Sequence, residues 1–177
     1  MRTAKNILPL ALTLLLCAAP TEAQQYPGGS HRIGAPQGTL VINSGFVNHL
    51  NAHTFHVYTF LFKPRVAGQA WQQVPVVESD SGAGMNFTLT TSNSADFTLR
   101  DAKVSLSAGR VLLQVAQKKY QSTPYDDNAT VEVMLYELQQ TRDEGRWIFK
   151  RVGARDVGTK VSIEQSLRSL DSHTRVK

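Results

Sequence analysis

The sequence predicts a mainly-β fold, an antiparallel β-sandwich or barrel-like fold of about eight or nine strands with one C-terminal α-helix. Two observations predict this class. Short runs rich in β-branched and aromatic residues recur through the chain, with turn-forming residues between them, which is the pattern of antiparallel sheets. A helical period of apolar residues appears only near the end of the chain, at Ile163, Leu167 and Leu170.

The chain begins with the features of a cleavable secretory signal peptide. Arg2 and Lys5 precede an apolar run over residues 7–16, and small residues occupy Thr21 and Ala23, the −3 and −1 positions of a cut after Ala23. The apolar run is too short to span a bilayer comfortably. Residues 1–23 are therefore interpreted as a signal peptide, and no later segment is apolar enough to predict a membrane span in the mature chain.

Cleavage after Ala23 leaves a mature chain without cysteine, because the only cysteine, Cys17, lies inside the signal peptide. An exported domain of this size without a disulfide is more typical of the bacterial periplasm than of eukaryotic secretion, so a periplasmic location is expected. Residues 24–37 are rich in Gly, Pro and Gln, which predicts a flexible lead. Residues 38–177 are expected to form a single β-rich domain.

The predicted central strand covers residues 53–64. Residues 38–43 form a first short strand before it, while residues 44–52 fit either one turn of helix or a loop. Both faces of the central strand are largely apolar, which predicts a strand covered above and below, and Pro64 ends it. One face carries Phe55, Val57, Thr59 and Leu61, and the other carries His56, Tyr58, Phe60 and Phe62.

The remaining strands follow at short spacing. Pro75 within residues 70–77 indicates an edge or a bulge, and Ser79–Gly84 has the composition of a turn or loop. Ser162 and Gln165 have the spacing of a capping box, which predicts a helix that begins after Ser162. Further strands are predicted within residues 85–91, 97–106, 111–117, 130–138 and 146–152, with turns at 107–110 and 143–145.

Charge argues against a nucleic-acid partner. The formal net charge is +5, or +4 without the charged residues of the signal peptide, and the charges are interspersed. A nucleic-acid-binding protein is expected to show a basic stripe with aromatic platforms, and none is found. The predicted export signal also argues against a nucleic-acid partner.

The histidines are the first candidate site. His49, His53 and His56 lie within eight residues, and on a helix the first two would share a face suited to zinc. On the predicted strand, however, His53 and His56 point to opposite faces. Ordinary buried or surface histidines are therefore favoured, no metal or other cofactor is predicted, and His56 is kept as a ligand or interface candidate.

Aromatic and acidic residues supply the other candidates. Trp71, Tyr120 and Tyr125 are interpreted as residues of a ligand pocket or dimer surface, with core packing as the alternative. Asp126 and Asp127 follow Tyr125, and adjacent carboxylates can bind calcium, but the other ligands of a calcium loop are missing. A turn with side chains that cap backbone N–H groups is the favoured interpretation.

Motifs for enzymatic chemistry are absent from the sequence. It contains no Gly-x-Ser-x-Gly elbow, no Ser-x-x-Lys pair and no glycine-rich phosphate loop. We therefore predict that the protein is not an enzyme and name no catalytic residue.

Several segments, taken in order, resemble the CarG-like carbapenem self-resistance proteins of Gram-negative bacteria. The similarity extends over roughly residues 55–167. It is carried by residues 55–62, 71–75 (WQQVP), 95–101 (ADFTLRD), 125–127 (YDD), 131–138 (VEVMLYEL) and 145–150 (GRWIFK).

The resemblance implies a periplasmic, β-rich homodimer that protects the cell from carbapenems without hydrolysing them. It brings no catalytic residues. The implied partners are a β-lactam or a protein of the cell envelope. The alternative is a periplasmic or secreted β-sandwich module that binds another ligand or protein, and a hydrolase with a dispersed site is the third hypothesis.

Overall fold

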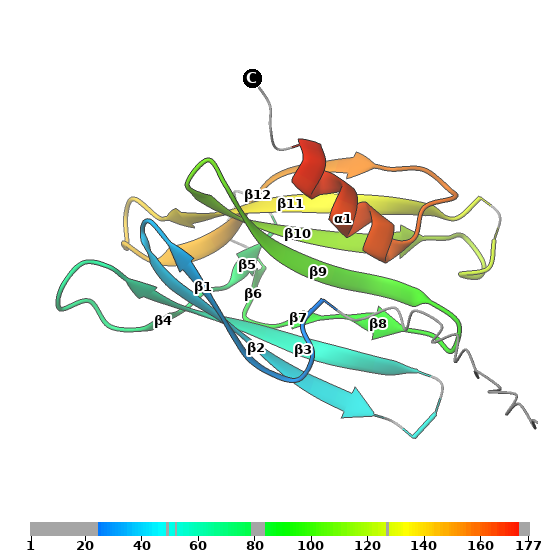
Figure 1. The fold of residues 1–177 in the computed structure, drawn as a ribbon, viewed down its shortest axis with the longest axis horizontal. Coiled ribbons are helices and arrows are strands. Elements are labelled where there is room, and N and C mark those ends of the chain that lie inside the picture. The colour runs from blue at the N-terminus through cyan, green and yellow to red at the C-terminus, as the bar shows by residue number, and fades with distance from the viewer. Residues whose placement is uncertain (1–24, 49, 52, 79–83, 127, 174–177) are drawn as a thin grey trace, which may run out of the picture.

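The computed structural model describes residues 25–48, 50–51, 53–78, 84–126 and 128–173, with side chains described up to residue 168. The predicted signal peptide, His49 and Asp127 lie outside the described residues. Twelve strands and one helix within them confirm the mainly-β class (Figure 1). Their bounds are β1 Gly29–Ala35, β2 Gly38–Asn48, β3 Thr54–Pro64, β4 Gln72–Gln73, β5 Val76–Val77, β6 Met85–Asn86, β7 Leu89–Thr90, β8 Ser92–Asn93, β9 Thr98–Ser107, β10 Arg110–Lys119, β11 Thr130–Gln140, β12 Trp147–Asp156 and α1 Ile163–His173.

Two antiparallel meanders form the facing layers of the molecule. β1, β2 and β3 pair in sequence order in one layer, and β9, β10, β11 and β12 do so in the other. Figure 1 shows the layers one above the other. The short strands β4, β7 and β8 pair with β3 and β5 pairs with β12, so that one continuous sheet includes both layers. Aromatic rings join the layers, since Phe60 packs edge-on against Phe149 at 5.1 Å and Phe62 lies 4.6 Å from Trp147.

The segment around Pro75 connects the two layers along one side. β4 pairs with β3, and Val74 N–H donates to the Phe60 carbonyl at 2.8 Å. Two residues later β5 pairs with β12, and Phe149 N–H donates to the Pro75 carbonyl at 2.9 Å. Residues 70–77, predicted as one strand with an edge or bulge at Pro75, thus form two short strands on either side of Pro75. The β5–β12 pairing is parallel, which differs from the all-antiparallel expectation.

The main core fills the space between the layers. It is built mainly from alternate residues of β2, β3, β9, β10 and β11, with Phe149 of β12, because successive side chains of a strand point to opposite faces. Its largest fully buried members are Tyr58, Phe60, Phe62, Tyr136 and Phe149. On β3 the opposite face stays partly exposed, so only one face of this strand is fully covered, and the prediction of cover on both faces is wrong.

Helix α1 covers the outer face of the second layer. Ser162 Oγ accepts from Gln165 N–H at 3.1 Å, and Gln165 Oε1 accepts from Ser162 N–H at 3.1 Å, which confirms the predicted capping box. Ile163 and Leu167 are buried against residues of β10 and β11. No helix within the described residues is long and apolar enough to cross a membrane.

The N-terminal segment differs from the flexible lead predicted for residues 24–37. Gly29–Ala35 forms β1, which pairs along its whole length with β2. Tyr26 is buried in the main core, and its hydroxyl accepts from Val104 N–H of β9 at 2.8 Å. Glycine and proline content suggested a loose segment, but the partners that order it lie far away in sequence.

The ambiguous residues 44–52 also resolve in part. Ser44 to Asn48 continue β2 and pair with β3, so this part is neither a helical turn nor a loop. Strong cross-strand pairing with the aromatic β3 determines this outcome. Phe46 illustrates it, since its exposed ring packs 4.9 Å from the ring of its partner His56.

Candidate functional site

A groove of about 700 Å³ opens at the end of the sandwich where β3 begins and β10 ends. Its volume is in the range of small-molecule sites. The lining combines three basic side chains, several hydroxyl and amide groups, and a few apolar or aromatic surfaces. The lining residues are His53, Thr54, Phe55, Thr90, Thr91, Ser92, Asn93, Leu99, Arg100, Gln117, Lys118, Lys119 and Tyr120.

Backbone pairing fixes one wall of the groove to β3. Thr91 N–H donates to the His56 carbonyl at 2.8 Å, and Thr91 Oγ1 accepts from His56 N–H at 2.8 Å. Asn93 pairs with Thr54, and Ser92 pairs with Arg100 of β9. The segment from Leu89 to Asn93 therefore holds the start of β3 beside the start of β9.

The charged side chains that line the groove are all basic. Lys119 forms an ion pair with Glu132 at 2.8 Å, and Lys118 Nζ lies 4.3 Å from the centre of the Phe97 ring. Arg100 is different, because its Nε is buried and has no hydrogen-bond partner among the described residues. A buried guanidinium N–H without an acceptor is costly, and Arg100 is itself one of the residues that line the groove.

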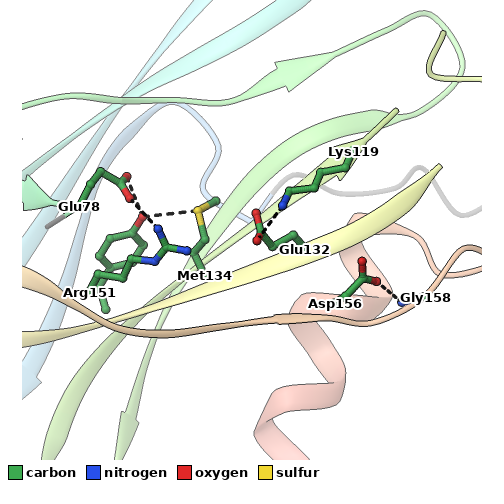
Figure 2. A network of polar contacts seen from close by, with 8 residues as sticks. Glu78, Lys119, Glu132, Met134, Arg151, Asp156 and Gly158 are labelled. Carbon is green, nitrogen blue, oxygen red and sulfur yellow. Dashed lines mark hydrogen bonds and ion pairs between the residues drawn. The ribbon is translucent and has the colours of Figure 1, made fainter. Parts of the chain in front are cut away.

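A second polar cluster lies farther along the neighbouring strands β11 and β12. The Tyr136 hydroxyl donates to Glu78 Oε1 at 2.8 Å, and Arg151 lies 3.7 Å from Glu78 Oε2. Figure 2 shows this cluster and, to its right, the Lys119–Glu132 pair, with the helix below that pair. Burial and the Glu78 contact raise the pKa of Tyr136, whereas the charges of Arg151 and Arg100 lower it. The phenol therefore stays protonated and acts as a donor.

His56 does not reach the groove. Its side chain is buried, and Nδ1 lies 2.8 Å from Ser44 Oγ. Ser44 Oγ has one proton, which it donates to the Tyr26 carbonyl at 2.9 Å, so His56 Nδ1 carries a proton and donates to Ser44. Burial lowers the pKa of His56. In this arrangement the histidine cannot act as the base that activates Ser44, so the pair ties the N-terminal segment to β2 and β3.

The structure brings some of the predicted site residues together and separates others. Tyr120 lines the groove and also an adjoining depression of about 570 Å³ that contains Asp126. Tyr125 lies in the same loop, where its hydroxyl donates to Asp96 at 2.6 Å. Trp71 is half-exposed beside β4, which pairs with the far end of β3. Trp71 and the groove are therefore at opposite ends of the sandwich.

Asp126 serves as a turn residue, as the favoured interpretation predicted. Its carboxylate accepts from the N–H groups of Ser122 and Thr123, each at 3.1 Å, and from the Thr123 hydroxyl at 3.2 Å. The backbone hydrogen bonds to Thr123 and Ser122 lower its pKa. Among the described residues, no three His, Cys, Asp or Glu side chains are grouped so as to hold a metal ion.

Sequence reasoning did not single out Arg100 or the Thr90–Asn93 wall. Arg100 lies two residues before Ala102 on the same strand, and Ala102 belongs to the main core, so strand alternation places the arginine on the inner face. A charged residue in phase with the core positions of a strand was the signal that could have found it. The groove wall could not be found this way, because it depends on pairing between distant segments.

Comparison with known proteins gives one solved structure. No family model matches the chain, and no curated protein matches it. The fold is similar to that in the crystal structure of CarG, with a TM-score of 0.65 over 86% of this chain and 97% of CarG, at 16% identity. At this identity the comparison shows the fold alone. The chain thus has a CarG-like fold, which confirms the predicted resemblance at that level.

Proposed function

We propose that this protein is a non-hydrolytic protective protein of the bacterial periplasm, which acts in carbapenem self-resistance by binding the drug or by shielding a cell-envelope target. The observation that carries this proposal is the CarG-like fold, which extends over 97% of the CarG chain. The resemblance drawn from the order of sequence segments supports it independently. A homodimer is part of the proposal.

Two features support a role without hydrolysis. The sequence lacks the Ser-x-x-Lys pair of serine β-lactamases. The buried Ser44–His56 pair has its proton direction reversed relative to a nucleophile and its base. Stoichiometric protection is therefore expected, with no turnover of drug beyond the amount of protein.

Survival of a carbapenem-susceptible bacterium that expresses the full chain tests the proposal. The matched control lacks residues 1–23 and so is not exported. Protection that requires the signal peptide, with no loss of drug from the medium, is the expected result. No protection by a chain that is shown to be folded and exported would overturn the proposal for that host.

The basic groove favours a second candidate function, a periplasmic binding module for another small ligand on the same scaffold. Its lining is largely assembled and its volume fits a small molecule. This candidate predicts ligand binding by an exported protein that gives no protection against carbapenem.

A further inference from the structure

We propose that the groove at the β3–β10 end is a binding site for a small amphipathic carboxylate, with Arg100 as the residue that pairs with the carboxylate. This goes beyond the fold likeness, which assigns no ligand site. Carbapenems carry a carboxylate and would be one such ligand. The inference rests on the proposed function only if the ligand is a carbapenem.

The position of Arg100 supports the assignment. β9 is paired so that Arg100 lies opposite Gln117 of β10 and Ser92 of β8, and all three line the groove. Alternation along β9 puts Arg100 on the same face as the core residues Ala102 and Val104. The guanidinium is therefore held between the layers, with its Nε buried and unpartnered among the described residues.

Charge in the groove favours an anion. Its charged lining residues are Arg100, Lys118 and Lys119, and none of the described lining residues is acidic. Glu132 neutralises Lys119 at 2.8 Å, which leaves Arg100 as the lining guanidinium available for a planar anion. A carboxylate can accept two parallel N–H donors from arginine, which gives both affinity and orientation.

The rest of the lining indicates an organic rather than an inorganic anion. Phe55, Leu99 and Tyr120 provide apolar and aromatic surface next to the basic residues. Hydroxyl and amide groups of the Thr90–Asn93 wall complete the site. Apolar surface with a few convergent polar groups is typical of small-molecule sites, so the ligand is expected to carry an apolar ring or chain beside its carboxylate.

Calorimetric titration of the full-length mature protein with 2-naphthoate tests the inference, with the methyl ester of 2-naphthoate as the uncharged probe. We expect the acid to bind, and the ester to bind at least about tenfold more weakly. Arg100→Gln should lower the affinity for the acid by about tenfold or more. Arg100→Lys keeps the charge but loses the two-pronged geometry, so an intermediate affinity is expected. Arg32→Gln, on the exposed face of β1, is the matched control and should bind as the wild type does.

Three outcomes would overturn the inference: no binding of the acid, equal binding of acid and ester, or unchanged affinity in folded Arg100→Gln. Thermal melting of each variant establishes that it is folded. A parallel titration with meropenem separates this inference from the proposed function. Naphthoate binding that needs Arg100, without meropenem binding, supports the carboxylate site and counts against drug binding.

Discussion

Asp101 is a buried carboxylate on β9, where the residue pairs with Ala116 of β10. It accepts hydrogen bonds from Ala102 N–H at 2.7 Å, from the Tyr58 hydroxyl at 3.0 Å and from Gln25 N–H at 3.3 Å. Burial raises its pKa, and these three hydrogen bonds offset that only in part. The residue therefore binds its proton more tightly in the folded protein than in the unfolded chain.

The pH dependence of stability follows from this shift. A raised pKa in the folded state adds stability below the unfolded pKa of 3.8, and this contribution is lost as pH rises through the folded pKa. Asp101→Asn cannot titrate. We expect the unfolding free energy of Asp101→Asn, relative to wild type, to increase as pH rises from 4 to 7, measured by urea titration.

Asp156 provides a control of opposite sign. Its pKa is lowered, chiefly by the hydrogen bond from Gly158 N–H at 2.9 Å. In the wild type, the stabilisation from the Asp156 carboxylate is present above its unfolded pKa and is lost as pH falls. The unfolding free energy of Asp156→Asn, relative to wild type, should therefore decrease as pH rises. A difference between Asp101→Asn and wild type that does not change with pH would contradict the linkage.

Among the elements, the β1–β2–β3 meander depends on one glycine. Gly38 begins β2, and a Cβ at this position would lie 2.2 Å from the Lys63 carbonyl oxygen and 2.7 Å from Phe62 Cζ. The obstructing atom is backbone of the paired strand β3, which cannot move without loss of the ladder.

Gly38→Ala should therefore destabilise the protein by about 2 kcal/mol or more. Gly34→Ala is the matched control, because Gly34 pairs with Thr39 in the same hairpin and a Cβ there meets nothing within 4 Å. The control should change stability by less than about 1 kcal/mol. Equal effects of the two substitutions in urea unfolding would show that the close approach at Gly38 is not limiting.

The sequence predicts elements whose partners are close in the chain. β10, β11, the following turn and the capped helix all show a local period or a local turn signal, and each was found within a few residues of its observed bounds. The short strands within residues 72–93 were harder to predict from the sequence, because β4, β7 and β8 pair with β3 while β5 pairs with β12. These pieces are two residues long, too short for any period to be read.

The candidate site, like the fold, could be predicted from the sequence only in part. Tyr120 was found because aromatic residues supply contact area wherever they lie, and it does line the groove. Trp71 was selected by the same reasoning and lies at the other end of the sandwich. Alternation with Ala102 could have placed Arg100 on the inner face of its strand, but its unfilled hydrogen-bonding position is seen only in the packed structure.

At the scale of the whole molecule, Tyr26 connects both layers. Its hydroxyl accepts from Val104 N–H of β9 at 2.8 Å, its carbonyl accepts from Ser44 of β2, and its ring packs edge-on against Tyr58 of β3 at 5.6 Å. In the described part of the chain, β8 pairs with β9 only as far as Arg100. Beyond that point the Tyr26 hydroxyl provides the acceptor for Val104 N–H.

Tyr26→Phe keeps the ring and removes the hydroxyl, so Val104 N–H is left buried without its acceptor. We expect a loss of about 1–3 kcal/mol in unfolding free energy. Tyr125→Phe removes the hydroxyl of an exposed tyrosine that bonds Asp96, and should have little effect. Comparable losses in the two variants would mean that the contact with β9 contributes nothing specific.

The reach of Tyr26 also bears on the order in which the molecule assembles. The contact with Val104 spans 78 residues, whereas each meander closes through short connections between consecutive strands. Closing a long loop is slow, because its entropy is lost before the contact forms. The two meanders should therefore form early, and Tyr26 should dock after the rate-limiting step. In stopped-flow kinetics, Tyr26→Phe is expected to speed unfolding and to leave the refolding rate nearly unchanged.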